Sequence, residues 1–271
     1  ISSITGPSQN DGFGSSVAIY NTTIAIGAPN ATVSAQINQG KVYVYSISGD
    51  LLHTIDGPVV QPANFGESVA LYLNKLAVFA KTDGAVADVG SVYIYDITAS
   101  PVTLIDTITI PAGFSPNTNR FFGQTLELNG NKLFISFYNG YEGACVEYDL
   151  AASQFVNLFE NKLPVPTSSD QFYQTLAYRP PFLFAGHPGA DSTFSSPAIT
   201  VTDVGAVQAY KTTDEEVDFT STSQYYLTIP GSPGQSVTNT SFGSQAIAND
   251  NWYVTRSNQL NTAIYLVYDT S

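Results

Sequence analysis

The side chains that could do chemistry in this chain are few. The sequence has two histidines, His53 and His187, one cysteine, Cys145, and 22 Asp and Glu residues. It contains no Gly-x-Ser-x-Gly elbow, no His-Glu-x-x-His motif and no phosphate-binding loop, so the common serine-hydrolase, zinc-protease and P-loop signatures are missing. A single cysteine also excludes an internal disulfide and a cysteine-based zinc site.

The reaction that these residue types best allow is glycoside hydrolysis. It needs two carboxyl groups at a defined separation, one acting as an acid and the other as a base or nucleophile. Carboxylates in segments that we expect to be loops are Asp83, Asp88, Glu142, Asp191 and Asp203. These carboxylates do not recur at matching positions along the chain. Carboxylates in loops are more often solvent-exposed side chains than catalytic groups. Glycoside hydrolysis therefore stays an alternative to a non-enzymatic role.

Composition limits the partners. The chain has 271 residues, of which 43% are hydrophobic and 11% charged, and its formal net charge is −13. Neither nucleic acid nor an anionic membrane attracts such an acidic surface. Without an apolar run of about 18 residues, we expect no membrane insertion. The absence of Met and a start at Ile1 predict a processed or excised polypeptide.

A repeat organises the whole chain. Each copy opens with a Phe-Gly-like pair, which is followed by an apolar run and then by a Val-Tyr-rich run. In the first four copies a further apolar run follows, and it ends at or near a proline. The opening pairs are Phe13-Gly14, Phe65-Gly66, Phe122-Gly123, Phe172-Tyr173 and Phe242-Gly243. Each Val-Tyr-rich run places a tyrosine at one recurring position, and we expect these five to pack between blades: Tyr45, Tyr95, Tyr148, Tyr210 and Tyr268.

Short strands at regular spacing with no helical period predict an all-β propeller. We expect one domain, 1–271, with five four-stranded antiparallel blades at approximately 13–58, 65–111, 122–164, 172–230 and 242–271. The fifth copy stops after its third strand. Residues 1–7 match Leu52–Pro58 in register and in their closing Gly-Pro. The N-terminal strand is therefore predicted to complete the last blade and close the ring, which would protect the sheet edges.

Copy one resembles the FG-GAP repeat, the blade unit of the integrin α-subunit head and of many bacterial and viral surface proteins. It carries Phe13-Gly14, then Gly27-Ala28-Pro29, then Gly40 followed by Lys41–Tyr45. Many such blades hold calcium in a loop spaced D-x-[DN]-x-D-G between strands one and two. Here that connection is a two- to four-residue turn, so the chain looks like the calcium-free variety, and we expect no metal and no cofactor.

The resemblance implies adhesion or ligand recognition. Propeller ligands usually meet the connections between strands two and three and between blades, because loops on a rigid scaffold carry recognition. Candidate ligand-binding residues on that face are Asp83, Asp88, Tyr138, Tyr141, His187, Asp191, Phe194 and Arg256. The expected partner is a glycan or surface protein of a partner cell, and the expected location is extracellular, on a cell surface or on a virion surface. The alternative is an architectural subunit that contacts neighbouring subunits of a surface assembly.

Overall fold

A computed structural model describes residues 3–58, 62–81, 89–110, 122–138, 143–160, 174–187, 192–195, 198–201, 206–212, 224–227, 246–248, 252–259 and 262–269. All regular elements in these ranges are β-strands. By their internal contacts the residues form two compact units, 1–137 with 147–155, and 138–146 with 156–271. Each unit is described by itself below.

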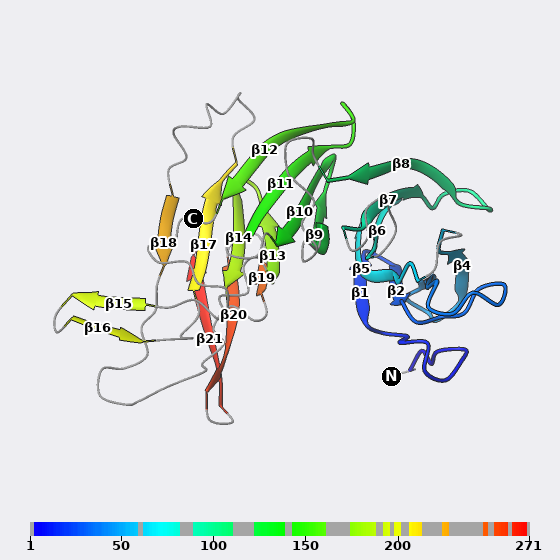
Figure 1. The fold of residues 1–271 in the computed structure, drawn as a ribbon, viewed down its shortest axis with the longest axis horizontal. Helices are drawn as coiled ribbons and strands as arrows, with labels where there is room; N and C mark the ends of the chain where they lie inside the picture. Colours follow the sequence, from blue (N-terminus) through cyan, green and yellow to red (C-terminus); the bar gives the residue numbers. More distant parts are fainter. Residues whose placement is uncertain are drawn as a thin grey trace. The chain divides into compact units, whose positions relative to one another are not determined.

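Blades one and two are four-stranded antiparallel sheets in which every strand pairs with its neighbours in the sequence (Figure 1). Blade one consists of β1 (Ser16–Tyr20), β2 (Thr23–Ala28), β3 (Lys41–Ser46) and β4 (Leu51–Asp56). Blade two consists of β5 (Phe65–Tyr72), β6 (Lys75–Ala80), β7 (Ser91–Asp96) and β8 (Thr103–Thr109).

Two further four-stranded sheets follow. Blade three consists of β9 (Phe122–Asn129), β10 (Lys132–Tyr138), β11 (Gly143–Asp149) and β12 (Gln154–Glu160). Blade four consists of β13 (Thr175–Arg179), β14 (Phe182–His187), β17 (Ala206–Lys211) and β18 (Gln224–Leu227). Between β14 and β17 lies a hairpin of β15 (Ser192–Ser195) and β16 (Ala198–Val201). A last sheet holds β19 (Ala246–Ala248), β20 (Trp252–Gln259) and β21 (Thr262–Asp269).

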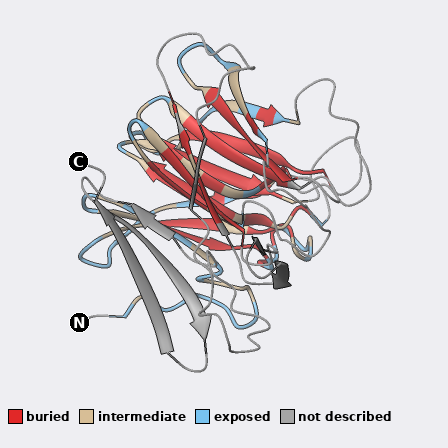
Figure 2. Ribbon diagram, turned by 90° about the vertical axis from the view of Figure 1, so that its left-hand side faces the viewer, coloured by how far each residue is buried: buried red, intermediate tan, exposed pale blue. Residues whose placement is uncertain are grey.

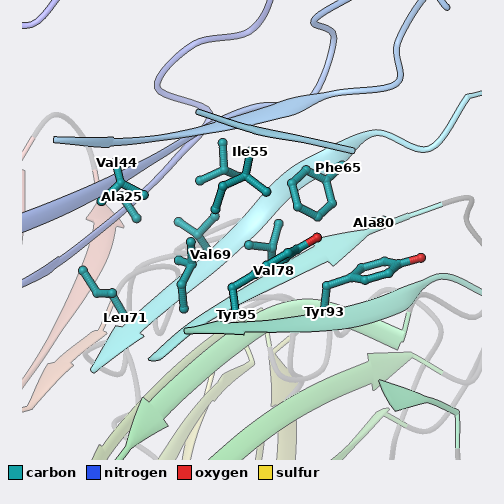
Figure 3. Packing of buried hydrophobic residues seen from close by; sticks show 12 residues of the cluster. Ala25, Val44, Ile55, Phe65, Val69, Leu71, Val78, Ala80, Tyr93 and Tyr95 are labelled. Atoms are coloured by element: carbon teal, nitrogen blue, oxygen red, sulfur yellow. The ribbon is translucent and has the colours of Figure 1, made fainter. Parts of the chain in front are cut away.

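The core of the first two blades lies between their sheets. Ala25, Val44 and Ile55 of blade one pack against Val69 and Leu71 of β5 (Figure 3). Burial is densest along the strands, while exposed residues gather at the turns (Figure 2). The alternation of side chains along each strand therefore lets one blade offer an apolar face to the next.

The two residues of the opening Phe-Gly pair have different structural roles. The Phe65 ring meets Tyr93 and Tyr95 edge-on, with ring centroids 5.8 and 6.1 Å apart. Phe13 meets Tyr43 and Tyr45 in the same way, at 5.5 and 6.3 Å.

The glycines of these pairs take positive φ angles, +90° at Gly14, +93° at Gly66 and +105° at Gly123. Such angles strain any residue with a Cβ. In each pair the phenylalanine ring packs in the blade, and the glycine that follows allows the backbone to turn with a positive φ.

The all-β propeller with four-stranded blades is confirmed, but the five-bladed closed ring is not. Within the described residues the structure has four four-stranded blades, and the last sheet has three strands. Residues 3–7, which we expected to belong to the closing strand, form no strand.

The physical reason for this difference lies in blade one. The carbonyl oxygen of Asp11 accepts a hydrogen bond from the Asn30 amide at 3.0 Å. Gly6 packs so closely on Phe13 that a Cβ at Gly6 would lie 2.6 Å from the Phe13 Cβ. The N-terminal segment is held on its own blade.

One glycine of blade one is predicted to be indispensable. A Cβ at Gly27 would overlap the carbonyl oxygen of Gly66 in the next blade, where backbone cannot easily move. Gly27→Ala should therefore lower the free energy of unfolding by about 2–3 kcal/mol, as overpacking does. Gly49→Ala is the control, because Gly49 has open space but a φ of +95°, so that only backbone strain of about 1–2 kcal/mol is introduced. Urea unfolding would contradict this view if Gly27→Ala cost no more than Gly49→Ala.

Candidate recognition surface

The structure describes the predicted site residues very unequally. Asp83, Asp88, Tyr141 and Asp191 lie outside the described residues. So do Glu142 and Asp203 of the carboxylate set.

Three more predicted residues are described through their backbones alone. Tyr138 ends β10, Phe194 lies in β15 opposite Ile199, and Arg256 lies in β20 opposite Tyr265. The segment around Phe194, which we expected to be a loop, thus contains a hairpin. Their part in ligand binding stays a prediction.

His187 is described in full, and it lies within the sheet. It is the last residue of β14, paired with Ala206, and its side chain is completely buried. Burial lowers the pKa of its imidazole to about 3, against a smaller opposite effect of a hydrogen bond with Gln208. The imidazole is therefore neutral at ordinary pH.

A buried polar network continues from His187. The Tyr210 hydroxyl donates to the Gln208 side-chain oxygen and lies 3.1 Å from the Glu160 carbonyl oxygen. Sequence reasoning missed this network, although Gln208 occupies the position held by Tyr43 and Tyr93 in blades one and two. Gln208 is polar where blades one and two have a tyrosine, and this difference could have indicated the buried network.

The recurring strand-three tyrosines do reach the preceding blade at two places. Tyr148 donates to the Asp106 carboxylate on β8 at 2.7 Å, and Tyr210 lies against Glu160 at the end of β12. Burial, together with the Asp106 carboxylate, raises the pKa of Tyr148 to about 12. The expectation that these tyrosines pack between blades is confirmed for both.

The connection between β2 and β3, residues 29–40, lies on the predicted ligand face and is described throughout. Val33 and Gln36 exchange two backbone hydrogen bonds, of 3.0 and 2.7 Å, around a turn in which Ser34 and Ala35 have positive φ. Gly40 donates to the Ala31 carbonyl oxygen at 2.9 Å. These bonds give the connection a fixed backbone.

The same connection is also tied to the next blade. The amide of Asn64 donates to the Asn38 carbonyl oxygen at 2.9 Å, and that of Phe65 to the Gln39 carbonyl oxygen at 3.1 Å. The buried Gln39 side chain donates to the Gly57 carbonyl oxygen at 2.6 Å, while its Oε1 has no partner. The connection is thus anchored at its base on both sides.

The side chains of this connection divide into two sets. Ala31 and Val33 point into the protein, whereas Thr32, Ser34 and Ile37 are exposed, Ile37 by 64%. The segment contains no charged residue. It can therefore offer hydroxyl groups, amide groups and one apolar side chain to a ligand, but no ion pair.

Within the described ranges, no group of three or more His, Cys, Asp or Glu residues could hold a metal ion. No helix in that part of the chain is long and apolar enough to cross a membrane.

A buried ion pair stands in blade three. Lys132 Nζ lies 2.9 Å from Glu147 Oε1, and Glu147 is only 1% exposed. Its position in β11 is that of Val44 in β3 and Ile94 in β7, which are both apolar and buried. A carboxylate in such a place depends on its cation.

Lys132→Met should therefore destabilise the protein by about 3–5 kcal/mol, because it removes the cation that lies 2.9 Å from the buried Glu147 carboxylate. Lys75→Met is the matched control: Lys75 begins β6 as Lys132 begins β10, and it bonds the exposed Asn131 amide oxygen at 2.7 Å. That control should change stability by less than about 0.5 kcal/mol. The double variant Lys132→Met, Glu147→Val should regain most of the loss in thermal unfolding. Failure of Glu147→Val to rescue would mean that the charge is not the cause.

His187 should make the fold sensitive to acid. Its folded pKa of about 3 lies below the ordinary value of 6.5, so the unfolded chain takes up this proton first as pH falls. The free energy of unfolding should decrease by up to about 1.4 kcal/mol per pH unit between pH 6.5 and 3 from this group alone. His187→Gln should flatten that slope in urea titrations. An unchanged slope in His187→Gln would refute the assignment.

Comparison with known proteins identifies the repeat. Residues 6–45 match the model of the FG-GAP repeat. No curated protein matches the chain by sequence.

Among solved structures, hydrazine synthase of Kuenenia stuttgartiensis is similar over 89% of this chain and 60% of that one, with a TM-score of 0.54 and 9% identity. The β-propeller domain of the Trilobed protease from Pyrococcus furiosus is similar over 94% and 82%, with a TM-score of 0.44 and 11% identity. A europium-containing methanol dehydrogenase is similar over 93% and 50%, with a TM-score of 0.48 and 11% identity.

The chain thus covers 60% of the hydrazine synthase chain and 50% of the methanol dehydrogenase chain, and at 9% identity the likeness to hydrazine synthase concerns the fold alone. Residues 6–45 thus carry an FG-GAP repeat, and together with the four-stranded blades this match supports an FG-GAP repeat β-propeller.

Proposed function

We propose that the chain is a non-enzymatic recognition module, on a cell or virion surface, that binds a glycan or a protein of a partner cell. The observation that supports it best is the fixed backbone of residues 29–40, which carries exposed side chains on the predicted ligand face. A loop that is already ordered loses little conformational entropy on binding, so that more of its contact energy appears as affinity.

The chemistry of the exposed set favours an uncharged ligand surface. Thr32 and Ser34 offer hydroxyl groups that can both donate and accept hydrogen bonds, as sugar hydroxyl groups do. Ile37 adds an apolar contact beside them. With a net charge of −13 on the chain, a partner of neutral or positive surface would meet the least repulsion.

Ile37 is the residue to test first. Ile37→Asp should weaken binding to a glycan array, or to partner-cell membranes, at least about ten-fold, because a central apolar contact is replaced by a charge that must be desolvated. Ile47→Asp is the matched control, since Ile47 is 58% exposed but follows β3, at the opposite end of that strand from residues 29–40. Binding should be insensitive to EDTA.

Four results would count against the proposal. Equal loss in both variants would point to a general effect on the fold, and no loss in Ile37→Asp would remove residues 29–40 from the binding surface. A chain that binds neither glycans nor partner-cell proteins would favour the architectural alternative, and turnover of a glycoside would favour the hydrolase.

A further inference from the structure

Two tyrosines lie against each other between blades one and two. The ring centroids of Tyr20 and Tyr72 are 4.5 Å apart, and the ring planes are tilted by 51°. This distance is shorter than the 5.5 Å between the rings of Phe13 and Tyr43. Both tyrosines belong to the same compact unit, and both are half-buried. Two oxidisable phenol rings from different blades are therefore in contact.

The backbone places the two tyrosines at equivalent positions. Tyr20 is the last residue of β1, and Tyr72 is the last residue of β5. These two strands lie side by side in the first unit. The turn after each tyrosine begins with a residue of nearly equal positive φ, +50° at Asn21 and +52° at Leu73. Because two equivalent hairpins carry the rings, the contact is set by regular strands.

The tyrosine pair is particular to blades one and two. The equivalent residue, which ends the first strand, is Asn129 in blade three and Arg179 in blade four. The repeat therefore does not require an aromatic residue at this position. Tyr20 also packs on the apolar core between blades one and two, which includes Leu71. This packing holds its ring beside that of Tyr72.

The two hydroxyl groups are hydrogen-bonded to each other. This bond is the largest cause that raises the pKa of Tyr20 above its ordinary value, and burial adds to it. Hydrogen-bonded hydroxyl groups also bring the ring carbons ortho to them close together, because each ortho carbon is next to the carbon that bears the hydroxyl. Those ortho carbons are the atoms that join when two tyrosyl radicals couple.

We propose that Tyr20 and Tyr72 form a site of oxidative cross-linking, at which hydrogen peroxide, activated by a peroxidase, joins the two rings into dityrosine. Each ring loses one electron and its phenolic proton, and the two radicals form one carbon–carbon bond between their ortho carbons. The hydrogens of those two carbons then move to the oxygens as protons, which restores both phenols. The two electrons and two protons removed reduce one hydrogen peroxide to two water molecules.

The cross-link would secure an end of the blade contact that is held by side chains. The Gly27–Gly66 contact and the hydrogen bond from Phe65 to Gln39 lie at the other end of β1 and β5. A bond between the tyrosines would close a loop of chain and constrain the unfolded state, as a disulfide does. A chain with a single cysteine cannot form such a disulfide within itself. The site is also independent of the ligand proposed above, since residues 29–40 lie at that other end.

Peroxidase and hydrogen peroxide, added to the dilute full-length chain, test the site. Peptide mapping should find the peptides of Tyr20 and Tyr72 joined, with the loss of two hydrogen atoms, in monomeric protein. Dityrosine fluorescence of the monomer should fall at least about ten-fold in Tyr20→Phe and in Tyr72→Phe, because groups held in contact react far faster than groups that must meet by diffusion. Tyr45→Phe is the matched control and should keep the signal, since Tyr45 is also half-buried but its ring contacts that of Phe13.

A stability measurement gives a second readout. Oxidised wild-type protein should unfold at a higher urea concentration than untreated protein, whereas oxidised Tyr20→Phe should show no such gain. Each Tyr→Phe variant keeps the ring, so its packing should be retained. Monomer fluorescence that persists in Tyr20→Phe, or a peptide map that joins other tyrosines instead, would overturn the proposal. Cross-links found only between chains, or an equal gain in urea stability in Tyr20→Phe, would overturn it as well.

Discussion

The fold depends on how closely the backbone of one blade approaches that of the next. Gly27, at the end of β2, lies so near Gly66 that no side chain fits between them. Gly66 can turn there because it has no Cβ, and its carbonyl oxygen accepts a hydrogen bond from the Ser16 hydroxyl at 2.7 Å. The two glycine signatures of the repeat are thus the two sides of one contact.

A different arrangement forms at this contact when one side changes. In blade two, Phe79 stands where blade one has Gly27, and its ring lies against Gly123 of the following blade. The glycine after the opening Phe is retained, because its φ is positive whatever faces it. Above the contact, the Phe65 amide donates to the Gln39 carbonyl oxygen and the Phe122 amide to that of Val89, both at 3.1 Å. This backbone hydrogen bond recurs between successive blades and sets their spacing. Because it does not involve the Phe ring, the residues that contact the ring can differ from blade to blade.

Repetition made the four-stranded blades predictable, because a pattern read in one copy could be checked in the others. Glycine and tyrosine positions followed for the same reason, as the inter-blade bonds of Tyr148 and Tyr210 show. Unique features were not predictable in this way. The match of residues 1–7 to Leu52–Pro58 is a local likeness, and it could not reveal that Phe13 and Asn30 hold that segment on blade one. The burial of His187 was hidden because its network partners, Gln208 and Glu160, lie far from it in sequence.

The candidate recognition surface, residues 29–40, lies next to the contact between blades one and two. Residues 29–40 leave the sheet just after Gly27 and return at Gly40, whose amide and carbonyl oxygen are both bonded. The backbone amides of Asn64 and Phe65, at the start of blade two, donate hydrogen bonds to the carbonyl oxygens of Asn38 and Gln39. The base of the connection therefore cannot move without separating the two blades. The exposed side chains of its tip, those of Thr32, Ser34 and Ile37, take no part in the Gly27–Gly66 contact, so their types can change without altering it. A scaffold that fixes the base of a loop while releasing its tip from packing can acquire new ligands without losing its fold.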